Sequence, residues 1–182
     1  NQAEILKANA IDVEKASTHA NAAFLDRLRL TPERISQMQT SLRDVMALPD
    51  PIGEIEEQKK LPNGLLLKRV RAPLGVILMI FESRPNVISE AFSLAVKSGN
   101  ALIMRGGSDS LQTSRTLYKL VTEALRSANL PEAVFWGIEN PDRAFVQGLM
   151  KQDKLIDILV PRGGDSLIEY VTQNATIPII KN

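Results

Sequence analysis

The sequence predicts an α/β fold: a Rossmann-like parallel sheet with helices on both faces, a helical N-terminal lead-in and a protruding β-hairpin. Three observations predict it. From residue 73 to residue 182, short apolar runs alternate with segments of helical length, as in right-handed βαβ units. Residues 1–48 carry apolar side chains at helical spacing. Between these regions, Asn63-Gly64 separates two extended segments, which is typical of a hairpin.

The lead-in is predicted to be helical through residues 1–48. Thr31-Pro32-Glu33 indicates a helix start, because a hydroxyl N-cap is followed by proline at the first helical position and by an acid in the first turn. An apolar stripe from Ile35 to Met46 continues this helix. Prolines at positions 49 and 51 then end it.

Residues 52–71 are predicted to form a two-stranded hairpin around Pro62-Asn63-Gly64. Its first strand is polar, and its second is richer in apolar side chains. Two strands alone are marginally stable in water. We therefore expect this hairpin to pair with a partner, either in its own chain or in another subunit.

The region of residues 73–182 is predicted to hold five parallel strands connected by helices. Residues 75–81 form a continuous apolar run, as expected for a strand buried on both faces. The expected strands are residues 75–81, 101–104, 133–136, 156–160 and 177–180, and the expected helices are residues 86–98, a long helix after 108, 141–152 and 165–174.

Composition excludes several classes of function. The chain has 22 basic and 21 acidic residues and a net charge of +1, which argues against a nucleic-acid surface. It has no cysteine, so we expect no disulfide, no metal site built on thiolates and no thiol nucleophile. It has neither a signal-peptide pattern nor an apolar run of membrane-spanning length. We therefore expect a cytoplasmic location and no membrane partner.

Two loops of the form Arg-Gly-Gly follow predicted strands and open predicted helices, at residues 105–108 and 161–164. Glycines allow a ligand to approach the backbone, helix N-termini favour anions, and a guanidinium suits phosphate. The pair therefore favours nucleotide binding, although each loop could also be a simple tight turn. Neither a G-x-G-x-x-G fingerprint nor a phosphate-binding P-loop motif occurs in the chain.

A third strand end carries Ser83-Arg84-Pro85-Asn86. Asn86 is either the N-cap of the next helix or an amide aimed into the crevice as an oxyanion donor. His19, the single histidine, lies in the lead-in without a metal-ligand partner at helical spacing, so we expect it to be a surface or structural residue.

Three segments together carry a resemblance to a known family. Residues 80–87, 97–108 and 156–164 resemble the γ-glutamyl phosphate reductases of the aldehyde dehydrogenase superfamily, also called glutamate-5-semialdehyde dehydrogenases. The lead-in is similar too, in residues 5–9, 25–28 and 48–53, so that the resemblance covers nearly all 182 residues.

The resemblance implies an enzyme of proline biosynthesis. The family reduces γ-glutamyl phosphate to glutamate 5-semialdehyde with NADPH and releases phosphate. A cysteine attacks the acyl phosphate, and hydride is delivered to the resulting thioester. In the family this cysteine follows the last strand, beyond Asn182. The resemblance therefore implies that residues 1–182 supply the cofactor-binding part and do not turn over substrate alone.

The resemblance also implies roles for the strand-end residues and for the hairpin. Arg105 would lie near the adenosine ribose, where it suits the extra phosphate of NADPH. Asn86 would donate to the oxyanion, and the hairpin of residues 52–71 would belong to the oligomerisation element of a homo-oligomer. The expected cofactor-binding residues are Arg105, Gly106, Gly107, Ser108, Pro161, Arg162, Gly163 and Gly164, and the candidate residues for binding γ-glutamyl phosphate are Ser83 and Arg84.

Two alternatives remain at the level of sequence. The chain could belong to another aldehyde or acyl-phosphate dehydrogenase with a different substrate. It could also be a non-catalytic module that binds a nucleotide or only assembles with a partner, which the lack of cysteine would fit.

Overall fold

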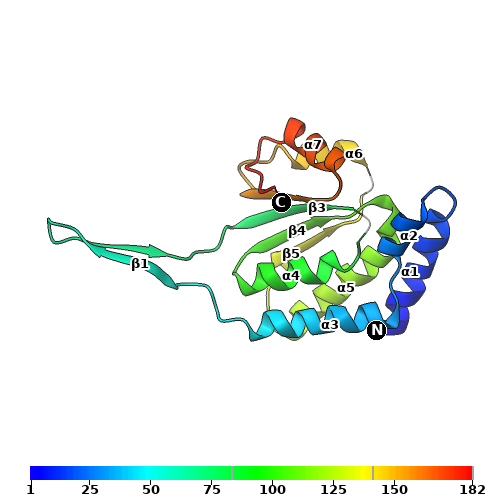
Figure 1. Ribbon diagram of the computed structural model, residues 1–182, viewed down its shortest axis with the longest axis horizontal. Coiled ribbons are helices and arrows are strands. Elements are labelled where there is room, and N and C mark those ends of the chain that lie inside the picture. The colour runs from blue at the N-terminus through cyan, green and yellow to red at the C-terminus, as the bar shows by residue number, and fades with distance from the viewer. Residues whose placement is uncertain (83, 141, 182) are drawn as a thin grey trace.

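The computed structural model describes residues 1–82, 84–140 and 142–181. Its body is a parallel sheet with helices on both faces, and a hairpin projects far from that body (Figure 1). The predicted fold class is confirmed. In the described part of the chain, no helix has the length and apolar character needed to cross a membrane.

The described residues form a sheet of four parallel strands in the order β5-β4-β3-β6. The chain runs outward from β3 to β4 and β5, then adds β6 on the other side of β3. Such a reversal creates a crevice at the carboxyl ends of the strands, where open α/β sheets bind ligands. The strands are β3 (Val76–Phe81), β4 (Ala101–Arg105), β5 (Phe135–Ile138) and β6 (Ile158–Arg162).

Two apolar clusters hold helices onto the two faces of the sheet. Phe81 of β3 packs into the cluster formed with α4, α5 and the lead-in, whereas Leu78 and Ile80 pack into the cluster formed with α6 and α7. Figure 1 accordingly shows α4 and α5 on one side of the sheet and α6 and α7 on the other. The helices are α4 (Val87–Lys97), α5 (Leu111–Ser127), α6 (Arg143–Leu149) and α7 (Asp165–Asn174), and short 3-10 helices are η1 (Ser108–Ser110) and η2 (Glu132–Val134).

The prediction of a fifth strand at residues 177–180 was wrong. This segment makes one isolated parallel bridge, between Ile179 and Leu159 of β6. Leu159 N donates to the Pro178 carbonyl at 2.9 Å, and Ile180 N donates to the Leu159 carbonyl at 3.0 Å. Pro178 itself has no N–H, so the ladder cannot continue through it.

Other boundaries moved by a few residues. The third strand begins at Phe135, because η2 occupies residues 132–134. The fourth strand covers 158–162 instead of 156–160, and the helix expected over 141–152 is α6, Arg143–Leu149. Pro141, the expected start of that helix, lies outside the described residues.

The lead-in is helical as predicted. Thr31 caps the third helix, since its Oγ1 accepts a hydrogen bond of 3.2 Å from Arg34 N, with Pro32 in the first turn. The first helix packs on α5 and the third on α4, on one face of the sheet, whereas the second packs on the first (Figure 1). They are α1 (Gln2–Ala16), α2 (Ala22–Leu28) and α3 (Pro32–Ala47).

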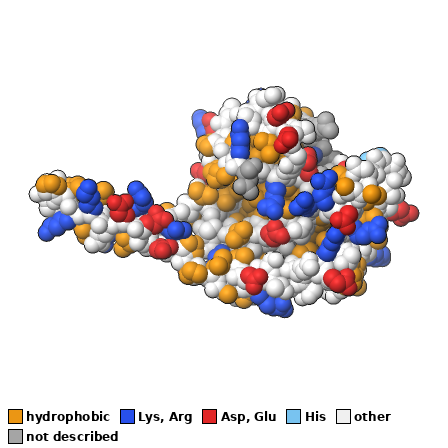
Figure 2. All heavy atoms as spheres, in the orientation of Figure 1, with side chains coloured by type: hydrophobic (Ala, Val, Ile, Leu, Met, Phe, Trp, Pro, Cys, Tyr) orange, Lys and Arg blue, Asp and Glu red, His pale blue; other side chains and the backbone are white. Residues whose placement is uncertain are grey.

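The hairpin consists of antiparallel strands β1 (Ile55–Lys60) and β2 (Leu66–Val70). Its turn depends on Gly64, which has φ +86° and donates its N–H to the Leu61 carbonyl at 2.9 Å. Every residue of both strands is exposed. Figure 2 shows apolar, basic and acidic side chains mixed along this arm. The hairpin therefore does not pack on its own sheet.

Candidate functional site

The two Arg-Gly-Gly loops flank the end of one strand. In the sheet register, Arg105 of β4 pairs with Ile80 of β3, and Arg162 of β6 pairs with Phe81 of β3. The loops are distant in sequence, but both emerge beside the carboxyl end of β3. The prediction that they share one sheet edge is confirmed.

A cavity of about 560 Å³, which we call the first cavity, opens at this edge. Of the predicted cofactor-binding residues, Arg105, Gly107 and Ser108 line it. The loop of residues 161–164 does not, although α7, the helix that follows this loop, forms a wall. Its other walls come from the end of β3, from α6 and from Phe24 of α2.

The glycines of these loops have different physical roles. A Cβ on Gly106 would lie 2.9 Å from the Phe81 ring, and a Cβ on Gly163 would lie 2.7 Å from both Glu82 Oε2 and Leu167 Cδ2. A side chain at Gly106 would therefore clash with the buried Phe81 ring, and one at Gly163 would require Glu82 and Leu167 to shift. A Cβ on Gly107 would meet open space and one on Gly164 would make only an ordinary contact, but of these two only Gly107 lines the first cavity.

An acidic side chain already occupies the N-terminus of α7. The Glu82 carboxylate accepts a hydrogen bond of 3.0 Å from Gly164 N. Sequence reasoning expected an external anion at this position, because helix N-termini attract negative charge. Any phosphate that binds to this N–H must first displace the Glu82 carboxylate.

A buried tyrosine supports the loop after β4. Tyr118 of α5 lies at 5% exposure, with its Oη 3.5 Å from the Met104 carbonyl. Burial raises the pKa of the Tyr118 phenol well above its ordinary value, and this outweighs the hydrogen bond to the Gly106 backbone, which lowers it. The phenol stays neutral and packs beneath the backbone of the loop.

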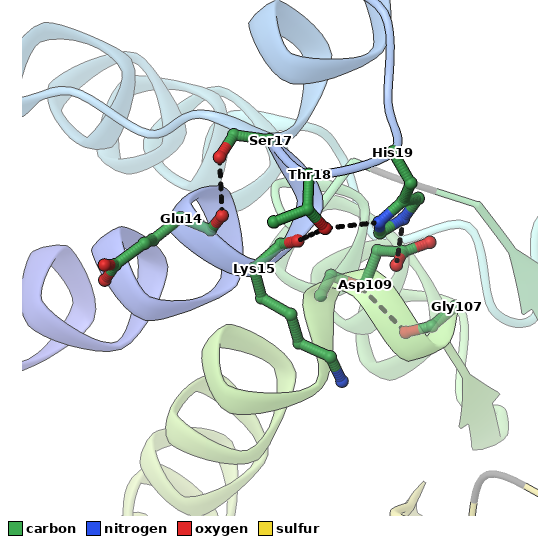
Figure 3. A network of polar contacts seen from close by, with 8 residues as sticks. Glu14, Lys15, Ser17, Thr18, His19, Gly107 and Asp109 are labelled. Carbon is green, nitrogen blue, oxygen red and sulfur yellow. Dashed lines mark hydrogen bonds and ion pairs between the residues drawn. The ribbon is translucent and has the colours of Figure 1, made fainter.

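The single histidine lies next to this loop. His19 Nε2 is 3.1 Å from Asp109 Oδ1, and His19 Nδ1 is 3.2 Å from Thr18 Oγ1 (Figure 3). Asp109 follows Ser108 and lines the first cavity. The interpretation of His19 as a surface or structural residue agrees with its side-chain exposure of 52%. Its contact with the strand-end loop was not foreseen, since 90 residues separate the two partners.

Asn86 does not use its side chain as an N-cap. It stands before α4 with helical backbone angles, and its Nδ2 donates to Glu90 Oε1 at 2.8 Å. Glu90 also lies 3.7 Å from Arg162 Nη2. The side-chain capping alternative is therefore wrong, and Glu90 links Asn86 to one of the Arg-Gly-Gly loops.

A second cavity, of about 390 Å³, is lined in part by the loop between β3 and α4. Arg84 and Asn86 of this loop line it, whereas Glu82 of the same loop lines the first cavity. Ser83, the other candidate for substrate binding, lies outside the described residues. Sequence reasoning missed Arg27 and Arg29, which also line the second cavity. The available signal was their closeness to Arg34, three arginines within eight residues.

The chain is similar over almost its whole length to known reductases. No family model matches it. The γ-glutamyl phosphate reductase of Shewanella denitrificans is 44% identical over 181 residues, which are 99% of this chain and 43% of that protein. The crystal structure of γ-glutamyl phosphate reductase from Thermotoga maritima superposes with a TM-score of 0.93 at 41% identity. The match includes 98% of this chain and 43% of that protein. The chain thus spans about two fifths of the length of these relatives.

More distant solved structures share the fold. A probable aldehyde dehydrogenase from Listeria monocytogenes has a TM-score of 0.71 at 16% identity, covering 98% of this chain and 37% of its own. An engineered glycolyl-CoA reductase with bound NADP⁺ has a TM-score of 0.61 at 18% identity, covering 97% of this chain and 45% of its own. The chain therefore shares its fold with the matching parts of these two proteins.

Proposed function

The chain is a homologue of part of γ-glutamyl phosphate reductase, and from this relationship we propose that the complete protein reduces γ-glutamyl phosphate to glutamate 5-semialdehyde with NADPH. Residues 1–182 act as its cofactor-binding part. The observation that carries the proposal is the identity of 44% with a reductase of that name over 99% of the chain. The same relationship disfavours a dehydrogenase for another substrate and a non-catalytic module.

The first cavity has the chemistry that a dinucleotide phosphate needs. Arg105 offers a guanidinium, Ser108 a hydroxyl, and Gly107 an unobstructed backbone. Apolar side chains such as Ile80 and Val146 can cover an adenine ring. Because Glu82 and Asp109 also line the cavity, we expect a phosphate to bind beside the Arg105 guanidinium and not beside either carboxylate.

Within this proposal, each residue has a defined task. NADPH, when bound, supplies the hydride. Arg105 binds the 2′-phosphate of the adenosine ribose, and Gly107 and Ser108 hold the neighbouring part of the cofactor. The loop of residues 161–164 would hold the pyrophosphate, and for Gly164 N to take part the Glu82 carboxylate would have to give up its hydrogen bond. Residues 1–182 contain no cysteine, so within this proposal they do not supply the nucleophile.

Asn86 is proposed as the oxyanion donor. A primary amide nitrogen carries two protons, and Glu90 accepts one of them. The second proton can donate to the oxygen on which negative charge develops, which lowers the free energy of the transition state. Glu90 then acts as a positioning residue, because its hydrogen bond sets the direction of the amide.

The cofactor assignment is tested by Arg105→Ala in the complete protein. A charge-assisted hydrogen bond contributes about 1.5–3 kcal/mol. Its loss should raise the KM for NADPH about tenfold or more and leave the KM for NADH nearly unchanged. Steady-state kinetics with each cofactor measure both values. The control is Arg126→Ala, which removes an exposed guanidinium paired with Glu132, outside both cavities.

Equal losses with both cofactors would show that Arg105 only supports its loop, and the 2′-phosphate contact would have to be abandoned. The Arg126→Ala control should leave both KM values at the level of the unmodified protein. Absence of reductase activity in the unmodified complete protein would overturn the proposed reaction itself.

A further inference from the structure

The second cavity is rich in positive charge. Four arginines line it against two acids, Asp26 and Glu90. We propose that it binds an anionic group of the acyl-phosphate substrate, held between Arg27 on one wall and Arg84 on the other, with Arg29 adding to the positive field. This inference rests on the proposed function, because the substrate named there carries both a phosphate and an α-carboxylate.

The acids in the cavity wall are already paired. Asp26 Oδ1 accepts a hydrogen bond of 2.8 Å from Arg34 Nη2. Glu90 accepts from Asn86 Nδ2 at 2.8 Å and lies 3.7 Å from Arg162. Neither carboxylate makes an ion pair with the remaining three arginines, so the acids of the cavity wall do not neutralise them.

Those three arginines, Arg27, Arg29 and Arg84, make no ion pair with any described residue. All three are exposed at the wall of the cavity. Isolated exposed arginines are common on protein surfaces. Three of them around one concave site, with the local acids already paired, leave a net positive charge that an anion can neutralise.

The backbone that carries Arg27 and Arg29 is held firmly from inside the molecule. Asn9, only 2% exposed, donates to the Leu28 carbonyl at 3.0 Å and accepts from Leu30 N at 2.7 Å. Leu28 and Leu30 are buried at 0% and 7% exposure. Buried side chains and paired backbone groups on both sides of Arg29 therefore fix the backbone from which Arg29 extends to the wall of the cavity.

Arg34 fastens the same segment from the solvent side. Its Nη1 donates to the Arg29 carbonyl at 2.7 Å and also to the Asp26 carbonyl, while its Nη2 binds the Asp26 carboxylate. The guanidinium group of Arg34 thus donates its hydrogen bonds to the end of α2 and the turn that follows it. Because the backbone of this segment is already held, only the arginine side chains lose conformational entropy when they bind a ligand.

The loop between β3 and α4 contributes residues to both cavities. Glu82 of this loop lines the first cavity, and Arg84 and Asn86 line the second. An anion held by Arg84 would therefore share a cavity with Asn86, whereas a cofactor beside Arg105 would occupy the other cavity. This arrangement suits a reaction in which substrate and cofactor approach one centre from two directions.

The test uses the complete reductase and the paired variant Arg27→Gln/Arg84→Gln, which removes one cation from each wall. Arg43→Gln is the matched control, because Arg43 is exposed on α3 and lines neither cavity. The reverse reaction, oxidation of glutamate 5-semialdehyde by NADP⁺ with inorganic phosphate, yields a separate KM for each reactant. The two possible anions can therefore be distinguished.

We expect the paired variant to raise one KM at least tenfold, to leave the KM for NADP⁺ within twofold, and to match the control in unfolding temperature. A raised KM for phosphate identifies a phosphate subsite. A raised KM for the semialdehyde identifies a subsite for its α-carboxylate. If both KM values stay within twofold of the unmodified enzyme, the inference is wrong.

A binding measurement separates this inference from the proposed reaction. Isothermal titration calorimetry with inorganic phosphate and with L-glutamate should show binding of at least one of them to the unmodified protein, weakened at least tenfold in the paired variant. Such a result in a protein without reductase activity would support the anion site and contradict the proposed reaction. Equal affinity for both probes in the paired variant and the unmodified protein, together with reductase activity, would support the reaction and contradict the anion site.

Discussion

Single residues at the sheet edge have roles that their identity alone does not reveal. Glu82 satisfies the N–H of Gly164, and its carboxylate lies 2.7 Å from the position that a Cβ on Gly163 would occupy. Glu90 binds Asn86 and lies near Arg162. These two carboxylates hold the strand-end loops before any ligand is present, because each satisfies donors of a loop that would otherwise need water.

Tyr118 should make the protein less stable at high pH. Burial raises the pKa of its phenol above the ordinary value of 10.0. Above about pH 10 the unfolded chain releases this proton while the folded protein retains it. Above pH 10, the contribution of Tyr118 should therefore lower the free energy of unfolding by about 1.4 kcal/mol per pH unit. Well below pH 10, Tyr118 should have no effect on the pH dependence of stability.

Chemical unfolding at pH 8, 10 and 11 measures this effect in the unmodified protein and in Tyr118→Phe. The variant keeps the ring and loses the ionisable group, so its loss of stability between pH 10 and pH 11 should be smaller by about 1 kcal/mol. Parallel pH profiles for the two proteins would mean that the phenol of Tyr118 does not stay protonated in the folded state.

At the scale of elements, α1 fixes the start of α5 through a buried acid. Asp12, 3% exposed, accepts hydrogen bonds from Thr113 N at 2.7 Å, Thr113 Oγ1 at 2.7 Å and Gln112 N at 3.1 Å. Unpaired N–H groups and the helix dipole both favour a carboxylate at this place. Because η1 and the loop of Arg105 lead directly into α5, this cap also positions one wall of the first cavity.

Replacing Asp12 by alanine should lower the free energy of unfolding by about 3 kcal/mol, because it leaves buried donors without an acceptor. Asp44→Ala is the control, since Asp44 is exposed on α3 and should change stability by no more than about 0.5 kcal/mol. Chemical unfolding of the complete protein measures both. Equal, small effects would show that water replaces the Asp12 carboxylate at the start of α5.

The hairpin is the element with the least support from its own chain. Its strands are exposed on both faces, including Leu66 at 52% and Leu67 at 59%. We propose that it pairs with a second copy of the protein, because two isolated strands are marginally stable and exposed strand edges favour pairing.

The double variant Leu66→Glu/Leu67→Glu puts a charge on both faces of β2 and should lower the molecular mass of the complete protein in solution, measured by sedimentation equilibrium. Leu130→Glu changes a leucine of similar exposure, 43%, on the body and should leave the mass unchanged. An unmodified protein that is already monomeric would refute the pairing.

At the scale of the whole molecule, one loop contributes residues to two cavities. Phe81 packs toward one helical layer and Leu78 and Ile80 toward the other, so the end of β3 is held from both faces of the sheet. The loop that follows β3 therefore starts from a rigid strand. Arg105 and Arg162 are the last residues of β4 and β6, the strands on either side of β3.

The sequence by itself determined the elements and the edge at which they converge. Apolar runs, helix starts and the Asn-Gly turn act through neighbouring residues, so local patterns predicted β3, the cap of α3 and the hairpin. The rule that parallel strands end at one edge was enough to bring Arg105 and Arg162 together. The fifth strand was predicted wrongly, because an apolar run around Pro178 satisfies the pattern but lacks an N–H for the ladder.

Only the tertiary structure decided which side chains share a cavity and which of them are already paired. The contacts of Asn9 with residues 28 and 30, of Glu82 with Gly164 and of His19 with Asp109 join segments that are far apart in the chain. No spacing in the sequence encodes them, because they depend on the rotation and packing of whole helices against the sheet. For the same reason, only the folded structure showed that Arg27 and Arg84 line the same cavity.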